Sequence, residues 1–205
     1  MNYLPIFYRI KQRACLVVGG GAVASRKVSL LRKAGADVTV VSTELCDELE
    51  KLASSKAIRH LNRQYEKRDL DGCMLAIAAT DHADVNEQIS ADAMSRNIPV
   101  NVVDNPQLCG FIIPSIIDRS PVQIAVSTGG SSPVLARLIR TRLEGLIPAA
   151  YGKLGALAEA FRNQVKAAFP NVEQRRHFWE SILEGTVAEQ VFTGHDAEAR
   201  QMLQA

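Results

Sequence analysis

Two short stretches of the sequence hold residues whose types and spacing could do chemistry. The first is Gly19-x-Gly21-x-x-Ala24, which lies between an apolar run and a helical pattern. There the spacing is typical of a dinucleotide-binding loop, in which the first glycine permits a tight turn and the second lets the backbone approach a pyrophosphate. Amide groups at the helix start then face the phosphates. A tight turn without a ligand is the alternative, whereas the pattern of a nucleoside triphosphate loop does not fit.

The second stretch is Asn101-Val102-Val103-Asp104, an apolar segment that ends in a carboxylate. In open α/β sheets ligands bind outside the carboxyl ends of the strands. A carboxylate placed there beside a nicotinamide could act as a general base. Asp104 could equally begin the turn before Asn105-Pro106, as aspartates often do. Position alone leaves both interpretations open.

Residues for the rest of a dinucleotide follow two other apolar segments. One ends at Val41-Ser42-Thr43, and Glu44 comes slightly late for the acidic residue that usually binds the ribose hydroxyls. No arginine takes its place to favour a 2′-phosphate, so we expect NAD rather than NADP. Thr80 and Asp81 close a further segment, where the other half of the cofactor should lie. Asp81 could equally cap the helix that follows.

A second glycine-containing loop, Ser127-Thr128-Gly129-Gly130-Ser131-Ser132-Pro133, also leads into a helical pattern. Glycines and hydroxyls at a helix start can bind carboxylates or phosphates. An ordinary capped helix, with Ser132 as the N-cap and Pro133 as the first residue, fits the same pattern. Arg137 and Arg140 follow three residues apart and can share a face of the helix.

A parallel sheet is needed to bring the first group of residues together, and the first half of the chain has the pattern of one. Strands are predicted at 14–18, 37–42, 58–61, 74–80 and 99–104, with helices at 22–33, 43–54 and 83–96. Apolar strands separated by helices indicate a parallel sheet with both faces covered. Right-handed crossovers make this a doubly wound, Rossmann-like α/β fold.

The rhythm changes after Asp104. Two strands are predicted at 111–117 and 122–127, and the link between them is short enough for an antiparallel hairpin. A helix is predicted from Pro133 to about 147. The remaining sequence is almost entirely helical in pattern, with breaks near Pro170, Gly185 and Gly194.

The composition excludes several classes of function. The 205 residues carry a net charge of only +2, which does not mark a general nucleic-acid binder. The apolar runs are too short to cross a membrane and no signal-peptide pattern is present, so we expect a cytoplasmic protein without a membrane partner. The four cysteines form no CxxC pair and no cluster with histidine, so no metal site is expected and the thiols should be reduced.

Six blocks of the sequence, in order, resemble a known family. They are LPIF, CLVVGGGAVASRK, LAIAATD, NVVD, FIIPSIIDRSP and STGGSSPVLAR. Together they are similar to the N-terminal module of bacterial siroheme synthases, a precorrin-2 dehydrogenase and sirohydrochlorin ferrochelatase. The resemblance implies NAD-dependent oxidation of precorrin-2 to sirohydrochlorin, then insertion of ferrous iron as a substrate to give siroheme. It also implies a homodimer with an NAD-binding domain (1–112), a dimerisation region (113–147) and a helical domain (148–205).

The resemblance further implies roles for single residues. Asp104 matches the catalytic aspartate of the family. Ala22 and Val23 match the pyrophosphate site, and Thr43 and Glu44 lie near the ribose. The loop that contains Ser127, Thr128, Gly129 and Gly130 matches one beside the tetrapyrrole, where some relatives carry a phosphorylated serine at the position we align with Thr128.

The substrate of this family is a polycarboxylate macrocycle, so Arg119, Arg137 and Arg140 are candidates to bind its carboxylates. Cys109-Gly110 replaces the Ala-Ser pair expected before Phe111 and could alter the pocket lining. Nothing after Arg200 resembles the methyltransferase module of complete siroheme synthases. Two alternatives stay open: a dehydrogenase without chelatase activity, and a non-catalytic sensor that binds a dinucleotide.

Overall fold

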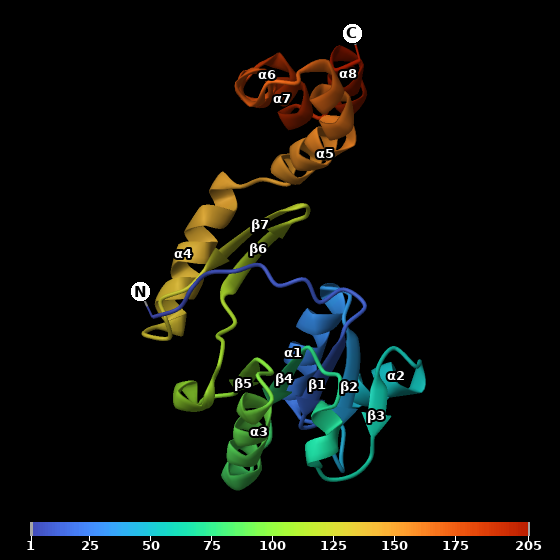
Figure 1. Ribbon diagram of the computed structural model, residues 1–205, viewed down its shortest axis with the longest axis vertical. Coiled ribbons are helices and arrows are strands. Elements are labelled where there is room, and N and C mark those ends of the chain that lie inside the picture. Colours follow the sequence, from blue (N-terminus) through green and yellow to red (C-terminus); the bar gives the residue numbers. More distant parts are fainter. Residues whose placement is uncertain (1, 205) are drawn as a thin grey trace. The chain divides into compact units, whose positions relative to one another are not determined.

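The computed structural model describes residues 2–204 and divides into two compact units, Met1–Ile113 and Pro114–Ala205. Figure 1 shows a sheet with flanking helices in the first unit, and a hairpin followed by helices in the second. In the residues that the structure describes, no helix is both long and apolar enough to cross a membrane.

Unit 1 is built on a five-stranded sheet in the order β3-β2-β1-β4-β5, in which every pairing is parallel. Its strands are β1 (Ala14–Val18), β2 (Asp37–Val41), β3 (Arg59–Leu61), β4 (Leu75–Ala78) and β5 (Val100–Val102). Its helices are α1 (Ala22–Lys33), α2 (Asp47–Ser54) and α3 (Ala83–Ser95), with short 3₁₀ turns η1 (Lys67–Leu70) and η2 (Pro106–Leu108). The predicted Rossmann-like α/β fold is confirmed.

Alternating side chains of the strands divide the interior of unit 1 into two cores. Cys15 and Val17 of β1 face one core, which is completed by residues of α1 and α2 such as Val28 and Leu49. Leu16 of β1 faces the other core, completed from α3 and η1. Because both faces of the sheet are covered, the central strands β1 and β4 are apolar throughout, as a buried parallel sheet requires.

Unit 2 begins with an antiparallel hairpin of β6 (Ser115–Arg119) and β7 (Val122–Val126), on which α4 (Pro133–Leu146) packs. Four further helices follow: α5 (Ala150–Ala168), α6 (Val172–Glu184), α7 (Thr186–Phe192) and α8 (Asp196–Met202). Leu154, Phe161 and Val187 belong to their shared core, and Phe178 and Trp179 pack against it. The breaks near Pro170, Gly185 and Gly194 therefore separate real helices.

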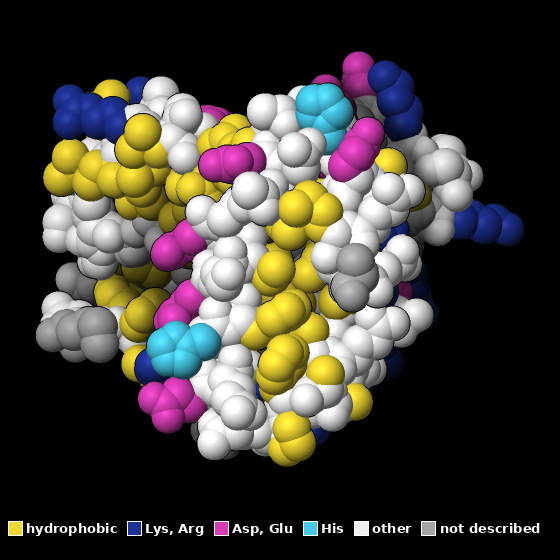
Figure 2. Space-filling model, turned by 90° about the horizontal axis from the view of Figure 1, so that it is seen from above, with side chains coloured by type: hydrophobic (Ala, Val, Ile, Leu, Met, Phe, Trp, Pro, Cys, Tyr) yellow, Lys and Arg dark blue, Asp and Glu magenta, His cyan; other side chains and the backbone are white. Residues whose placement is uncertain are grey.

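Hydrophobic side chains also reach the surface of unit 2. Figure 2 shows them gathered in patches among polar residues. On α4 the exposed large hydrophobic residues are Val134, Leu135, Leu138, Ile139 and Leu146, and on the later helices they are Tyr151, Val172, Leu183, Phe192 and Met202. A run of exposed apolar residues on one helix is a common mark of an interaction surface.

Two predicted elements start about four residues later in the structure than predicted, whereas the other bounds differ by at most two residues. The helix predicted from 43 starts at Asp47, because residues 42–46 form a loop in which Ser42 Oγ donates to the Glu44 carbonyl (2.7 Å) and the Cys46 amide donates to the Gly20 carbonyl (2.8 Å). The strand predicted from 111 starts at Ser115, because the amides of Gly110 and Phe111 donate to Val100 instead of to the hairpin partner.

Candidate functional site

A pocket of about 950 Å³ opens where the strands of unit 1 end. It is lined by residues 18–23 after β1, 41–46 after β2, 63–65 after β3, 79–82 after β4 and 103–104 after β5, with further residues from α3. The strand order reverses between β1 and β4, and ligands of open α/β sheets bind at such a point. A cavity of this volume is in the range of small-molecule and cofactor sites.

The three consecutive glycines of the first loop have different surroundings. A Cβ atom on Gly19, whose φ is +120°, would lie 2.2 Å from the Ala79 carbonyl oxygen, and one on Gly20 would lie 1.8 Å from the Glu44 carbonyl oxygen. A Cβ on Gly21 would meet nothing within 4 Å. The first two glycines therefore let neighbouring loops pack closely, whereas the third leaves open space on the pocket side.

The N-terminus of α1 faces this space without a side-chain cap. Gly21 is its N-cap residue, and the first turn holds no acidic side chain. The first amides of a helix have no partner inside the helix, and with the helix dipole behind them they attract anions. Ala22 and Val23 carry two of these amides at the pocket wall. An uncapped helix start beside an open glycine fits a diphosphate.

Thr43 and Glu44 lie in the loop after β2, are exposed, and line the same pocket. The loop is fixed from two sides, because His60 Nε2 hydrogen-bonds the Ser42 carbonyl (2.9 Å) and the Cys46 amide donates to Gly20. The pocket thus has an acidic side chain near the end of β2, although it is displaced from the last residue of the strand.

Thr80 and Asp81 line the pocket after β4. The Thr80 hydroxyl donates to Asn86 Oδ1 (2.8 Å), and Asn86 Nδ2 donates back to the Thr80 carbonyl (2.9 Å), so this side chain braces the start of α3. The N-cap of α3 is His82, and no side chain caps the helix. Asp81 is therefore not its N-cap residue, and its carboxylate is available to the pocket.

Asp104 lies just beyond β5, at the pocket wall, with a left-handed backbone (φ +59°). That conformation costs a non-glycine residue on the order of 1 kcal/mol, and such strain gathers at functional sites. Within residues 2–204 its carboxylate accepts no hydrogen bond, and the turn that follows is closed by backbone groups, such as the Leu108 amide to the Asn105 carbonyl (3.2 Å). The carboxylate thus has no capping role in this turn.

A lysine of α1 lies within electrostatic range of that carboxylate. Burial lowers the pKa of Lys27, nearby Arg26 adds to the effect, and the charges of Asp104 and Cys109 act in the opposite direction. Asp104 therefore has a cation in its surroundings but no ion-pair partner at contact distance among the described residues.

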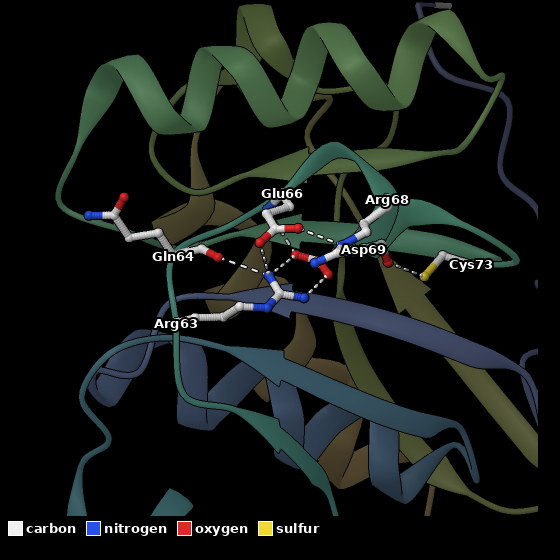
Figure 3. Close-up of polar contacts among 6 residues, drawn as sticks. All are labelled: Arg63, Gln64, Glu66, Arg68, Asp69 and Cys73. Atoms are coloured by element: carbon white, nitrogen blue, oxygen red, sulfur yellow. Dashed lines mark hydrogen bonds and ion pairs between the residues drawn. The ribbon is translucent and has the colours of Figure 1, made fainter.

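Arg63 also lines the pocket, although the sequence analysis did not single it out. Figure 3 shows its guanidinium directed at the carboxylate of Asp69, with Glu66 and Arg68 alongside. Burial acts to raise the pKa of Asp69, but hydrogen bonds from Arg63 and from the Glu66 amide, with the charge of Arg63, outweigh it and lower that pKa. The available signal was position: Arg63 comes two residues after the strand predicted at 58–61, and Thr43 comes directly after the strand predicted at 37–42.

The predicted substrate loop belongs to unit 2 and forms a capped helix start. Thr128 Oγ1 donates to the Ser132 carbonyl and accepts from the Ser132 amide (both 3.0 Å), and Ser132 Oγ accepts from the Leu135 amide (3.2 Å). The Gly129 amide donates to Ser127 Oγ (3.0 Å). Gly129 and Gly130 have positive φ angles, which glycine adopts readily.

The three candidate arginines of unit 2 differ in their partners. Arg119 Nε donates to the Ile147 carbonyl (2.9 Å) and its NH2 group lies 3.6 Å from Glu144. Arg140 pairs with the same Glu144 (3.0 Å). Arg137 is exposed on α4 and has no ion pair among the described residues, so it is the one with an uncompensated charge.

The sheet, the glycine loop and the uncapped helix start are the features of the class of dinucleotide-binding folds. The chain belongs to the family described as putative NAD(P)-binding, whose match spans residues 6–115, more than half of the 205. The family described as sirohaem biosynthesis protein central matches residues 119–146, and the one described as sirohaem synthase dimerisation region matches residues 150–205.

Individual relatives extend the likeness over the whole chain. The siroheme synthase of Thioalkalivibrio sulfidiphilus is 60% identical over 204 residues, which are 100% of this chain and 42% of that protein. The siroheme synthase of Methylobacillus flagellatus is 57% identical, again over 100% of this chain and 44% of its own length. The resemblance to siroheme synthases is thus confirmed, and the chain spans less than half the length of these relatives.

A solved structure shares the fold. It is SirC, described as a precorrin-2 dehydrogenase, with a TM-score of 0.76 and a match over 98% of this chain and 99% of its own. The two sequences are 21% identical, so this likeness concerns the arrangement of the backbone. It agrees with a Rossmann-like sheet followed by a helical region.

Proposed function

We propose that this chain oxidises precorrin-2 to sirohydrochlorin with NAD, and that Asp104 is the catalytic base. One observation carries the proposal: the free amides at the start of α1 and the unpaired carboxylate of Asp104 line the same pocket. The names of the similar proteins, siroheme synthase and precorrin-2 dehydrogenase, support the choice of substrate.

In this proposal, different groups of pocket residues bind different parts of the cofactor. The amides of Ala22 and Val23 bind the diphosphate, and Gly21 leaves room for it, as does the turn at Gly19. Thr43 and Glu44 face the adenosine ribose. Thr80 and Asp81 lie at the end of β4, beside the nicotinamide half.

The chemistry needs a hydride acceptor and a base. When bound, the nicotinamide accepts a hydride, with the electron pair of the broken C–H bond. The second hydrogen of precorrin-2 leaves as a proton, and the Asp104 carboxylate accepts it. A positioned general base typically contributes about 10²–10⁴ in rate.

We further propose that ferrous iron, as a substrate, enters the sirohydrochlorin product while two pyrrole protons leave, with Asp104 again available to accept a proton. The likeness to proteins named siroheme synthase supports this second reaction. Among residues 2–204 no group of three or more His, Cys, Asp and Glu side chains could hold a metal ion, so the nitrogens of the macrocycle are the ligands in this proposal. A dehydrogenase without chelatase activity is the alternative.

For the rest of the chain we propose a homodimer with 1–112 as the NAD-binding domain, 113–147 as a dimerisation region and 148–205 as a helical domain. The match described as a dimerisation region and the exposed apolar residues of α4 support a subunit contact in unit 2. Ser127, Thr128, Gly129, Gly130, Arg119 and Arg137 are proposed to contact the carboxylates of the substrate. A cytoplasmic location stays a prediction, consistent with four free cysteines.

The substitution Asp104→Asn tests the catalytic proposal. Because the amide cannot accept the proton, we expect the dehydrogenation rate to fall by about 10²–10⁴, measured by absorption spectroscopy with precorrin-2 and NAD. The affinity for NAD should stay within about a factor of two in calorimetric titration. Asp71→Asn, which changes an exposed carboxylate that pairs with Arg96 outside the pocket, is the matched control and should leave the rate unchanged. An Asp104→Asn variant with a normal rate would refute the assignment.

A further inference from the structure

Arg63 lies just beyond β3, at the same edge of the sheet as the proposed ribose site. β2 and β3 pair in parallel with Val41 opposite Leu61. Thr43 and Arg63 each lie two residues beyond this pair, so the loops that contain them start side by side. Both residues line the pocket. In dinucleotide-binding folds this is the place where an acidic residue binds the ribose 2′-hydroxyl or an arginine accommodates a 2′-phosphate.

The guanidinium of Arg63 is already held by two parallel hydrogen bonds to Asp69, one from NH2 to Oδ1 (2.5 Å) and one from NH1 to Oδ2 (2.9 Å). NH1 also donates to the Gln64 carbonyl (2.9 Å). We call the paired contact the Arg63–Asp69 fork. Three of the five N–H groups of the arginine are thus in use, and the other two, on Nε and NH2, are the ones left for a ligand.

Asp69 is built into its position. Its side chain is 3% exposed, against 32% for Arg63, and its Oδ2 also accepts from the Glu66 amide (2.9 Å) at the start of η1. Burial and the second hydrogen bond therefore hold the Asp69 carboxylate in position toward Arg63. A bidentate arginine–carboxylate pair of this kind is among the stronger polar contacts in proteins.

The charges around the fork are balanced. Arg68 pairs with Glu66 at 2.5 Å, and the other Glu66 oxygen lies 3.8 Å from Arg63 NH1. Two cations and two carboxylates therefore lie within ion-pair distance of one another, as Figure 3 shows. Glu44 adds a further negative charge at the same end of the pocket. Among the described residues that line the pocket, Arg63 is the only lysine or arginine, and Asp69 compensates its charge, so a 2′-phosphate would meet no free cation there.

We propose that the Arg63–Asp69 fork sets the cofactor preference of the pocket. Arg63 offers its remaining N–H groups to a ribose with free hydroxyls, while Asp69 neutralises its charge and occupies its bidentate face, so that a 2′-phosphate is not held. The inference rests on the proposed function, because it requires a dinucleotide in this pocket.

The test is calorimetric titration of the full chain with NAD⁺ and with NADP⁺, scored as the ratio of the two dissociation constants. We expect the unaltered chain to favour NAD⁺ by about tenfold or more. Asp69→Asn keeps an acceptor oxygen for the Glu66 amide but removes the charge, and should lower the preference about tenfold, because a freed cation near a phosphate is worth at least the 1.4 kcal/mol that this factor represents.

Two further variants separate the fork from a general effect on folding. Arg63→Ala should increase the preference for NAD⁺, since it removes the positive charge beside the phosphate and leaves the negative charge of Asp69 without its arginine partner. Combining Arg63→Ala with Asp69→Asn should abolish the gain in NADP⁺ affinity. Asp71→Asn, which alters a carboxylate two residues away that pairs with Arg96 and does not line the pocket, should leave the ratio within a factor of two.

The outcomes distinguish this inference from the function on which it rests. If the unaltered chain binds NAD⁺ but no variant of Arg63 or Asp69 moves the ratio by more than a factor of two, the fork is structural only and the inference is overturned, with the proposed function intact. A gain in NADP⁺ affinity that persists in the double variant overturns it as well. If neither dinucleotide binds the unaltered chain, both proposals fail together.

Discussion

The chain contains two glycine-bearing loops that each run into a helix, Gly19–Gly21 before α1 and Ser127–Pro133 before α4. In unit 2 the helix start is closed, since Ser132 Oγ accepts from the Leu135 amide and Thr128 Oγ1 bonds the Ser132 amide. In unit 1 no side chain caps α1, and a Cβ on its N-cap residue would meet nothing within 4 Å. Similar sequence patterns thus give one helix start with a side-chain cap and one without.

The largest expected effect comes from giving α1 the cap that it lacks. Gly21→Asp places a carboxylate at the N-cap position, where it accepts from the first-turn amides, and the backbone of Gly21 (φ −84°, ψ −175°) suits any residue. A carboxylate some 4 Å from a phosphate charge costs about 4 kcal/mol at an effective dielectric constant of 20. We therefore expect NAD⁺ affinity to fall at least about a hundredfold, measured by calorimetry.

Gly21→Ala is the matched control, because it adds a methyl group without a charge and should cost much less affinity. Circular dichroism of Gly21→Asp should show a folded chain of undiminished thermal stability. Iron insertion into supplied sirohydrochlorin should persist, because that step needs no nicotinamide. If the Asp variant keeps its NAD⁺ affinity within a factor of three, the α1 amides are not the diphosphate site.

The opposite change removes the cap of α4. Ser132→Ala deletes the acceptor of the Leu135 amide and should cost about 1 kcal/mol at the helix start. Hydrogen exchange of that amide should quicken about fivefold. NAD⁺ affinity should not change. Ser131→Ala, which removes a neighbouring exposed hydroxyl, is the control; an equal effect from Ser131→Ala would show that the cap is not what protects the amide.

The smallest expected effect is a response to pH. The pKa of Asp69 is lowered in the folded chain, so its contribution to stability is present above the ordinary carboxyl pKa of about 3.9 and is lost as the pH falls through the lower folded value. The protection of the Glu66 amide, which donates to Asp69, should therefore decline below about pH 4 in hydrogen exchange. The Leu135 amide, bonded to a hydroxyl, should keep its protection, and a parallel decline of both would count against the assignment.

The sequence predicted the fold of unit 1 because buried parallel strands are recorded as apolar runs, and the intervening helices have their own periodicity. It placed Gly19, Gly21 and Asp104 at the sheet edge because strand ends are visible in that pattern. It did not locate the start of α2 at Asp47, since the loop before it is held by a contact with Gly20 from another part of the chain.

Arg63 was missed for a related reason. The strand before it was predicted, but the role of the arginine depends on Asp69, which lies in the turn beyond that strand. The alternative role of Asp81 as a helix cap also needed coordinates, because the chain places His82 at the N-cap of α3. Such assignments depend on which side chains meet in space, and local sequence does not encode that.

The unequal surroundings of Gly19, Gly20 and Gly21 have a consequence for how such a chain can diverge. Any side chain at the first two positions collides with a carbonyl oxygen. Variants at these positions should therefore misfold and be lost during evolution. The third position admits a side chain without a clash, so a lineage can lose its dinucleotide there and still persist as a well-formed scaffold. A homologue that retains the first two glycines but carries an acidic residue at the third should therefore fold normally but no longer bind a dinucleotide.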